Sequence, residues 1–499
     1  MKFTIEKKVS VAALKSCDVL LLPIKSALIA KLDKADQALI ANVIKSKQLK
    51  SGEVKMLRLG NAPAYVLLAA AEDLTERKFG LLVRQLVRAA KAEGAKKIGI
   101  YLEDFERENL FAETAAAAIA EHALAAHFDF SEQFKTPPKE GWKRVEEIKL
   151  FTYHDAKKIE EAIAKGETIG ESINLCRTLS NYPPGDMMPE ALMEAAQDIA
   201  KTSKKIELTI FDEARLKSEG MNAILAVGRG SVNPPRLIIM EYKGGKSNDE
   251  PLALVGKGVT FDSGGLNLKP GEGMADMHMD MSGGAAVLAA IKAIAALELP
   301  VNIVGLVPAV ENMPSGTSYR QGDIIKAYGG KTIEIGNTDA EGRVIMADAI
   351  EYAKTKKPAL IFTIATLTGA AVSALGMRAS ALFVKNNKPL QDAMQQLGEE
   401  SGDRLWPLPL WDEHEKDVEG TYADVTNTSK SGSRYGWALF AAAFLSHFAK
   451  PLPFVHVDMA PRMTTIPEEE FLSKGASGYG VKLIVELATQ WSKIKPIVK

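Results

Sequence analysis

Residues 255–270 read VGKGVTFDSGGLNLKP and carry the clearest signal of fold class in the 499-residue chain. The short apolar run at Leu252–Gly256 predicts a strand, and a glycine-rich loop with Lys257, Asp262 and Lys269 follows it. Open α/β sheets bind their ligands in loops at the carboxyl ends of strands. The stretch therefore predicts an α/β domain with a functional site at this edge of its sheet.

Further short apolar or β-branched runs lie on both sides of this stretch, with helical patterns between most of them. They predict strands at residues 205–211, 236–241, 301–308, 359–365, 381–385 and 454–459. Alternating strands and helices are typical of a sheet covered by helices on both faces. We therefore expect residues 186–499 to form a large α/β/α sandwich catalytic domain with a central mixed sheet.

The first part of the chain shows the same alternation on a smaller scale. Strands are predicted at residues 18–24, 65–69, 97–102 and 147–153, and helices at residues 76–93 and 112–127. A long Ala-, Ile- and Glu-rich helical pattern then runs from Asp155 to about Leu179. We expect a small α/β domain at residues 1–154 and a helical linker at residues 155–185.

The overall charge hides a gradient along the chain. The formal net charge is −1, but residues 1–100 hold 19 Lys and Arg against 9 Asp and Glu. Solvated helix faces, or ion pairs between subunits, explain a basic segment of this kind. A surface that binds DNA is the alternative, and composition alone leaves it open.

Cysteine usage and hydropathy bear on the compartment. Cys17 and Cys176 lie far apart, and the charged start of the chain does not resemble a signal peptide. No apolar run approaches the ~20 residues of a membrane span. We expect a reducing, cytoplasmic environment and no membrane partner.

Several catalytic motifs are missing from the sequence. It contains no H-E-x-x-H of the zincins and no G-x-x-x-x-G-K-[ST] of the P-loop proteins. Gly256-Lys257-Gly258 does not continue into a dinucleotide fingerprint, because Phe261 stands where the third glycine is needed. Ser263 and Ser282 lack the preceding glycine of a nucleophile elbow.

Two further segments place carboxylates beside glycine. Residues 277–286 read MHMDMSGGAA, with Asp280 just before a predicted helix, where capping of that helix is the simpler explanation. Residues 336–343 read GNTDAEGR, with Asp339, Glu341 and Arg343 at alternate positions. In an extended segment, alternate side chains point to one side, so these three groups would converge.

Four carboxylates without histidine or cysteine suit divalent ions that bind through oxygen, such as Mg, Mn or Zn. Like charges so close together repel one another unless cations neutralise them. Two ions about 3.5–4 Å apart bridge a water and lower its pKa. Peptide hydrolysis and phosphate-ester hydrolysis both use this arrangement, so it leaves the substrate class open.

These segments together resemble a known family. VGKGVTFDSGGLNLKP, DMSGGAA, NTDAEGR and ATLTGA (residues 365–370) are similar, in order and spacing, to the cytosolic leucyl aminopeptidases, the two-metal peptidase family M17. GMNAILAVGRGSVNPPRL (residues 220–237) also resembles a family segment. The resemblance covers residues 155–499 strongly, whereas residues 1–150 match only in length and α/β character.

The resemblance implies an aminopeptidase that removes bulky apolar N-terminal residues such as Leu with a hydroxide held between two Mn or Zn ions. It implies five metal ligands: Lys257, Asp262, Asp280, Asp339 and Glu341. Lys269 would polarise the scissile carbonyl and stabilise the oxyanion, as expected of a cation aimed at developing charge. Arg343 would hold a bicarbonate ion that carries a proton to the leaving amine.

The same resemblance implies a side-chain pocket and an assembly. The pocket would be lined by Met277, Thr366, Gly369, Ala460 and Met463. Pro461 and Arg462 depart from the common family pattern beside it. The family also implies a homohexamer whose active sites face an internal cavity that peptide substrates enter.

Overall fold

The computed structural model describes residues 1–7, 9–46, 49, 53–70, 74–107, 110–433 and 435–498. The chain divides into two compact units. Unit 1 contains Met1–Asn174 and Thr465–Lys474, and unit 2 contains Leu175–Thr464 and Gly475–Lys499. Helix α5 (Ala156–Asn181) contains the point of division. The boundaries expected at residues 154 and 185 stay predictions.

Unit 1 is built on a six-stranded sheet in the order β1-β6-β5-β2-β4-β3, in which only β3 runs antiparallel to its neighbour. Its strands are β1 (Lys2–Glu6), β2 (Val19–Pro23), β3 (Val54–Arg58), β4 (Tyr65–Ala69), β5 (Lys97–Tyr101) and β6 (Glu147–Phe151). The four predicted strands are confirmed. β1 and β3 were not predicted, because each is short and mixes charged with apolar residues.

Two cores lie on the two faces of this sheet. One contains side chains of α3 (Glu76–Glu93) and α4 (Ala112–His127), and the other contains side chains of α1 (Val11–Lys15) and α2 (Lys34–Lys45). In α3, Phe79, Val83 and Leu86 recur at helical spacing and are fully buried. The Thr75 side chain caps this helix, and Gly94 ends it in the left-handed conformation at φ 74°. Unit 1 also contains the short α16 (Pro467–Glu470) and the first part of α5.

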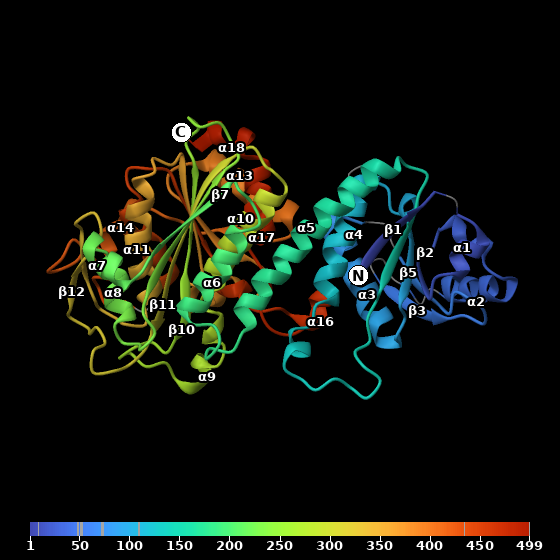
Figure 1. Cartoon of the computed structure of the whole chain (residues 1–499), viewed down its shortest axis with the longest axis horizontal. Coiled ribbons are helices and arrows are strands. Elements are labelled where there is room, and N and C mark those ends of the chain that lie inside the picture. Colours follow the sequence, from blue (N-terminus) through green and yellow to red (C-terminus); the bar gives the residue numbers. More distant parts are fainter. Residues whose placement is uncertain are drawn as a thin grey trace. The chain divides into compact units, whose positions relative to one another are not determined.

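Unit 2 contains a nine-stranded mixed sheet in the order β16-β15-β18-β14-β9-β11-β8-β7, with β10 also paired to β11 (Figure 1). Its strands are β7 (Ile206–Phe211), β8 (Arg236–Lys243), β9 (Leu252–Gly256), β10 (Gly258–Asp262), β11 (Asn302–Asn312), β14 (Leu360–Ala365), β15 (Ser380–Val384), β16 (Leu405–Pro407) and β18 (Phe454–Asp458). β18, β14, β9 and β11 run parallel, and β10 runs parallel to β11. Five strands therefore end at one edge of the sheet.

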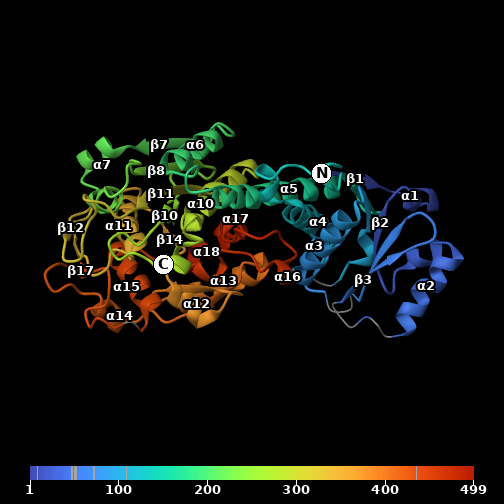
Figure 2. The ribbon, with the colours of Figure 1, turned by 90° about the horizontal axis from the view of Figure 1, so that it is seen from below.

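Helices cover both faces of this sheet, as Figures 1 and 2 show. α6, α10 and α17 pack on one face, and α8, α11 and α15 pack on the other. The helices of unit 2 after α5 are α6 (Pro189–Ala200), α7 (Glu213–Glu219), α8 (Asn222–Gly228), α9 (Gly271–Met274), α10 (Ser282–Ala296), α11 (Glu341–Lys354), α12 (Gly369–Leu375), α13 (Lys388–Ser401), α14 (Asp412–Asp417), α15 (Trp437–Ala449), α17 (Val481–Thr489) and α18 (Trp491–Val498). The predicted fold class, a small α/β domain and a larger α/β/α sandwich with a mixed sheet, is confirmed.

A three-stranded sheet lies beside the main one in unit 2, formed by β12 (Ile324–Lys326), β13 (Thr332–Glu334) and β17 (Val425–Thr426). Among the described residues, the helical stretch Gly271–Ala296 is long and apolar enough to cross a membrane. Most of it is buried inside the unit, as expected of a core helix.

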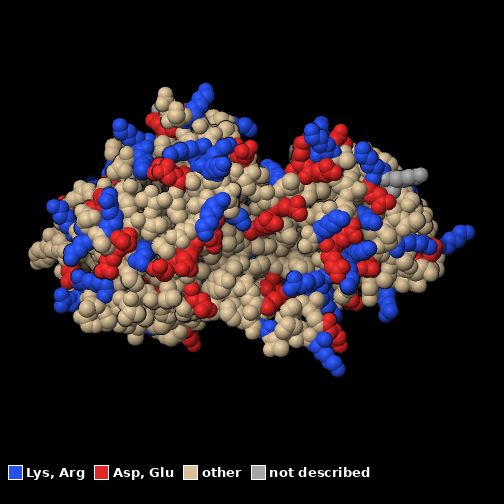
Figure 3. All heavy atoms as spheres, in the orientation of Figure 1, with Lys and Arg blue, Asp and Glu red and all other residues tan. Residues whose placement is uncertain are grey.

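Charged side chains of both signs are interspersed over the face of each unit seen in Figure 3. Several basic side chains of unit 1 are paired with carboxylates, among them Lys91 with Glu132 at 2.9 Å and Lys96 with Glu146 at 2.8 Å. Part of the basic excess in residues 1–100 is therefore neutralised by acidic residues from later in unit 1.

Candidate metal centre

The carboxyl ends of the parallel strands of unit 2 supply most of the candidate site. Lys257 joins β9 to β10, and Asp262 is the last residue of β10. Asp280 follows a short 3-10 turn (Met277–Met279), and Glu341 is the first residue of α11. The site thus gathers three chain segments at the edge of the sheet where α/β proteins bind ligands.

Close contact between backbones brings two of these segments together. A Cβ on Gly256 would lie 2.5 Å from the Gly283 carbonyl oxygen, and one on Gly283 would lie 2.3 Å from the Ile364 carbonyl oxygen. No side chain fits at either position, so α10 approaches β9 and β14 through glycine. Asp280, two residues before α10, is held beside Lys257 as a result.

Lys257 lies at the centre of the buried part of the site. Its Nζ is 2.7 Å from Asp280 Oδ2 and 2.8 Å from Glu341 Oε1, and it donates to the Thr366 carbonyl oxygen at 3.1 Å. Carboxylate oxygens of Asp262, Asp280 and Glu341 lie within 4.8 Å of one another, and all three residues are buried. This carboxylate triad is the group of acidic residues best placed to hold a cation.

Lys269 makes a second, more accessible pair of contacts. Its Nζ is 2.8 Å from Asp262 Oδ2 and 2.5 Å from Asp339 Oδ1. Lys269, Asp339 and Arg343 line a cavity of about 720 Å³. The side chain of Lys269 is 16% exposed, whereas that of Lys257 is 3% exposed, so the two lysines differ in their access to a ligand.

Neutral side chains fix the orientation of the carboxylates. Asn312, the last residue of β11, donates from Nδ2 to Asp262 Oδ1 at 2.9 Å and to the Thr338 carbonyl oxygen at 2.9 Å. Thr366 donates from Oγ1 to Asp280 Oδ1 at 2.7 Å. Sequence reasoning missed Asn312, because it lies in no motif and beyond the strand predicted at residues 301–308, whereas β11 extends to it.

Two details of the sequence interpretation are wrong. Asp280 makes no capping hydrogen bond to α10, because its carboxylate is used by Thr366 and Lys257. Glu341 and Arg343 are not in an extended segment, since α11 begins at Glu341. The alternate spacing therefore does not explain their convergence, and Glu341 instead stands at a helix N-terminus, where negative charge is favoured.

The described stretch after β9 also differs from the predicted loop, because Gly258–Asp262 forms β10. β10 pairs with β11 alone, and its register shifts between Val259 and Phe261. It has five residues and begins with a glycine, so its alternation of apolar and polar side chains is too short for a strand to be predicted from it.

Arg343 is a buried cation without a carboxylate partner among the described residues. It is 2% exposed, and its Nη1 donates to the Asn427 carbonyl oxygen at 3.0 Å. The Trp437 ring centroid lies 5.7 Å from its Cζ, and its buried Nε has no hydrogen-bond partner. Burial lowers the pKa of Arg343 to about 10. A guanidinium in this state suits an anion that approaches from the cavity.

The pKa directions agree with a site made of mutually dependent charges. Burial and the neighbouring Glu341 raise the pKa of Asp262, and burial raises that of Asp339 to about 7. Burial would raise the pKa of Glu341, but the ammonium groups of Lys257 and Lys269 outweigh it and lower the value. Burial alone would lower the pKa values of Lys257 and Lys269, but the nearby carboxylates outweigh it and raise both values.

The residues fit a divalent cation. Glu341 Oε2 is buried and has no hydrogen-bond partner, so one carboxylate of the triad keeps a strong acceptor without a donor. Four carboxylates and one amine at a dry site match the oxygen and nitrogen ligands of Mn and Zn. The ammonium groups of Lys257 and Lys269 lie among these carboxylates and neutralise part of their negative charge.

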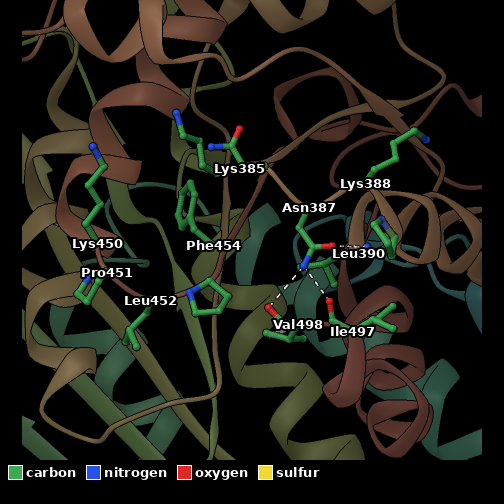
Figure 4. A pocket seen from close by; sticks show the side chains of 13 residues that line it. Lys385, Asn387, Lys388, Leu390, Lys450, Pro451, Leu452, Phe454, Ile497 and Val498 are labelled. Carbon is green, nitrogen blue, oxygen red and sulfur yellow. Dashed lines mark hydrogen bonds between the residues drawn. The ribbon is translucent and has the colours of Figure 1, made fainter.

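A second cavity in unit 2, shown in Figure 4, is a poorer candidate for a ligand-binding site than the cavity beside Lys269. It has a volume of about 610 Å³ and lies at the amino end of β18, where Asn387 donates to the Ile497 carbonyl oxygen at 2.8 Å. Its lysines are neutralised, since Lys385 and Lys450 share Glu415. This cavity offers no buried, unpaired group to a ligand among its described residues.

Comparison with known proteins assigns the family. The family model described as the cytosol aminopeptidase family, catalytic domain, matches residues 174–485, and the model for the N-terminal domain of the same family matches residues 22–138. A protein from Syntrophotalea carbinolica named "Probable cytosol aminopeptidase" is 39% identical over 473 residues, or 93% of this chain and 94% of the relative.

Two solved structures have the same architecture over nearly the whole chain. A mutant of tomato leucine aminopeptidase matches with a TM-score of 0.86 at 30% identity, covering 98% of this chain and 96% of that one. The bottromycin maturation enzyme BotP in complex with Mn matches with a TM-score of 0.82 at 31% identity, covering 95% of this chain and 100% of that one.

The chain belongs to the cytosol aminopeptidase family. The two matched family models account for both units of the structure and for the segment that holds the carboxylate triad. The protein is therefore a metallo-aminopeptidase, a hydrolase that acts on the amino termini of peptides.

Proposed function

We propose that the protein hydrolyses the first peptide bond of peptides with a bulky apolar N-terminal residue such as Leu, using two divalent ions, Mn or Zn. The observation that carries the proposal is the buried carboxylate triad joined through lysines to a cavity of about 720 Å³. Five side chains would hold the ions: Lys257, Asp262, Asp280, Asp339 and Glu341. When bound, the ions supply Lewis acidity toward the scissile carbonyl and the attacking water.

Lys269 is the electrophile in this proposal. Its ammonium lies at the wall of the cavity, and the neighbouring carboxylates hold its pKa above the usual range, so it stays charged. A fixed positive charge in a site largely closed to water stabilises the negative oxygen that develops on the carbonyl. The more deeply buried Lys257 serves as a ligand instead.

Arg343 holds the anion. Its Nε is buried and unpartnered, and the residue lines the same cavity as Lys269. We assign it a bicarbonate ion, which supplies a base close to the attacking water and the leaving amine. Asn427 and Trp437 hold the guanidinium in place for this task.

The apolar preference rests on the side-chain pocket expected from Met277, Thr366, Gly369, Ala460 and Met463. Of these, Gly369 lines the cavity beside Lys269, and Thr366 is tied to Asp280. Release of Leu, Met, Ala and Lys from matched dipeptides measures the preference. Faster release of Lys than of Leu would contradict it.

The central test compares three variants after loading with Mn²⁺ or Zn²⁺, with Leu-p-nitroanilide as substrate. We expect Lys269→Ala and Glu341→Ala each to lower kcat/KM by about 10²-fold or more, since each removes a charge from the reacting centre. Lys388→Ala, at an exposed position in the second cavity, is the matched control and should retain wild-type activity. Full activity in Lys269→Ala or Glu341→Ala overturns the proposal.

We also propose a cytoplasmic homohexamer. Light scattering checks the assembly, because a species near 53.9 kDa is the monomer and would contradict the hexamer. Cell fractionation checks the compartment, and recovery of the protein with the membranes would contradict a cytoplasmic location.

A further inference from the structure

Thr338 is neither a proposed metal ligand nor a proposed catalytic residue, yet it is bonded closely to the metal centre. It precedes Asp339 in the segment between β13 and α11 and is fully buried. Its backbone N–H and its hydroxyl are bonded to the loop that follows β10. Its carbonyl oxygen accepts from Asn312 Nδ2 at 2.9 Å and from the Tyr319 hydroxyl at 2.7 Å. All its polar atoms therefore have partners, which hold the residue in one position.

The loop that follows β10, residues 263–269, is closed on itself. The Lys269 N–H donates to the Ser263 carbonyl oxygen at 2.9 Å. Asp262 lies directly before this loop and Lys269 at its end, and Lys269 Nζ is 2.8 Å from Asp262 Oδ2. The relative position of these two functional side chains therefore depends on the shape of the loop.

The Thr338 side chain is bonded to the backbone in the middle of this loop. Its hydroxyl donates to the Gly264 carbonyl oxygen at 2.7 Å and accepts from the Asn267 N–H at 2.8 Å. The Asn267 side-chain oxygen accepts from the Thr338 N–H at 2.9 Å. We call these three hydrogen bonds the Thr338 clamp. The clamp joins the loop to a segment about 70 residues later in the chain, because Asn267 and Thr338 are 71 residues apart.

Two glycines make room for the clamp. Gly264 and Gly265 both have left-handed backbone conformations, with φ at 86° and 62°. A Cβ on Gly265 would lie 3.2 Å from Thr338 Oγ1. A Cβ on Gly264 would lie 2.8 Å from Asp339 Oδ1. Glycine at both positions therefore allows the loop and the later segment to approach each other this closely.

The clamp fixes Asp339 relative to Asp262, because Asp339 follows Thr338 directly. Lys269 Nζ is 2.8 Å from Asp262 Oδ2 and 2.5 Å from Asp339 Oδ1, so the two carboxylates converge on one point. Asp280 is held by contacts outside the clamp. A cation bound between Asp262 and Asp339 therefore depends on the clamp more than a cation bound beside Asp280 does.

We propose that Thr338 is a positioning residue whose hydroxyl sets the geometry in which Asp262 and Asp339 bind one of the two cations. The inference rests on the two-ion site of the proposed function, and it adds a residue that acts through its neighbours. Groups that orient metal ligands without touching the metal typically contribute about 10- to 100-fold to metal affinity.

Calorimetric titration with Mn²⁺ tests the proposal, and metal-free wild type should bind two ions per chain. Thr338→Val keeps the shape of the side chain without its hydroxyl. This variant should bind one ion about 10-fold or more weakly, and the other within about threefold of the wild-type affinity. Thr338→Ser keeps the hydroxyl and should bind both ions within about threefold of the wild-type affinity.

Thr363→Val is the matched control for the loss of a buried hydroxyl. Thr363 is fully buried within β14, and its hydroxyl donates to the Val455 carbonyl oxygen at 3.2 Å. This variant should bind both ions as wild type does. The visible absorption of the Co²⁺-loaded protein, which reports the coordination geometry, should change in Thr338→Val and stay unchanged in Thr363→Val.

Asn267→Ala tests the other side of the clamp. Asn267 is only half-buried, so its truncation should leave the fold intact. The variant removes the oxygen that accepts from the Thr338 N–H and should weaken the same ion. In the double variant of Thr338→Val and Asn267→Ala, the two losses of affinity should not add in full, because both changes disrupt one set of hydrogen bonds.

The inference is overturned if Thr338→Val binds both ions with wild-type affinity or weakens both ions equally. It is also overturned if Thr338→Ser is as impaired as Thr338→Val, or if the losses in the double variant add in full. A wild-type protein that binds fewer than two Mn²⁺ ions per chain would instead reject the proposed function, on which the inference rests.

Discussion

Gly342→Ala is expected to disable the site by displacing Lys257, although it adds a single methyl group to a helix. Gly342 is the second residue of α11, between Glu341 and Arg343. A Cβ at this position would lie 2.5 Å from Lys257 Cε and 2.7 Å from its Nζ. Ordinary contacts between such atoms are about 3.5–4.0 Å, so the end of the lysine must move by about 1 Å.

That movement breaks the contacts that Lys257 makes with two members of the triad. The 2.7 and 2.8 Å distances from Nζ to Asp280 and Glu341 would lengthen to about 3.7 Å, outside hydrogen-bond range. A displacement of this size at a reacting centre can cost about 10²-fold in rate. Folding should suffer less, because Ala gains about 1 kcal/mol over Gly in a helix and offsets part of a clash worth about 1–3 kcal/mol.

The assay is hydrolysis of Leu-p-nitroanilide after Mn²⁺ loading, with urea denaturation measured in parallel. We expect kcat/KM to fall by about 10²-fold and the free energy of unfolding to change by less than about 2 kcal/mol. Gly185→Ala is the control, because a Cβ there meets nothing within 4 Å. A Gly342→Ala protein that keeps more than half of the wild-type kcat/KM would refute the role given to Lys257.

Three other outcomes are expected. Thr366→Val removes the hydroxyl that donates to Asp280 Oδ1 at 2.7 Å. We expect this variant to bind Mn²⁺ about 10-fold or more weakly than wild type in calorimetric titration. An unchanged affinity would contradict the orienting role of Thr366. Chelation with EDTA should abolish activity, and adding Mn²⁺ or Zn²⁺ should restore it. The circular dichroism spectrum should stay unchanged, because Lys257 and Lys269 neutralise carboxylates of the triad when no metal is bound. Loss of the helical signal would contradict this. Asp348→Asn should cost about 1–3 kcal/mol in urea denaturation, because Asp348 accepts from the backbone N–H groups of Ala223, Ile224 and Tyr328. Burial raises the pKa of Asp348 to about 7, above its unfolded value near 3.9, so the contribution of Asp348 to the free energy of unfolding falls as pH rises from about 4 through 7. The loss of unfolding free energy in Asp348→Asn should therefore be larger at pH 5 than at pH 8. A loss that does not depend on pH would contradict this.

The fold and the chemistry of the site were predictable from local patterns. Apolar runs such as Leu252–Gly256 and Tyr65–Ala69 became strands with the predicted bounds, because a buried strand needs a short continuous apolar segment. The acidic and basic residues that follow strands in unit 2 were expected near one another, since parallel strands end at the same edge. The structure brings Lys257, Asp262 and Lys269 into one network of contacts.

Contacts between distant segments were not predictable in the same way. The backbone carbonyl oxygen of Asn427 accepts a hydrogen bond from Arg343, 84 residues away, and the side-chain amide of Asn312 donates to Asp262 across 50 residues. Neither residue lies in a motif, and their roles depend on how distant segments meet in three dimensions.

The hydrogen bonds at the end of β18 have a consequence for biosynthesis. Asp458 accepts from the backbone N–H groups of Leu367 and Thr368 at 3.1 and 3.3 Å and from Thr368 Oγ1 at 2.6 Å, and so holds the loop whose Thr366 orients Asp280. The residues that form or support the metal centre thus extend along the chain from Lys257 to Asp458. A ribosome that has not yet released residue 458 carries a nascent chain whose peptidase centre is incomplete. Activity against amino termini is therefore acquired only after residue 458 has been made and has left the ribosome.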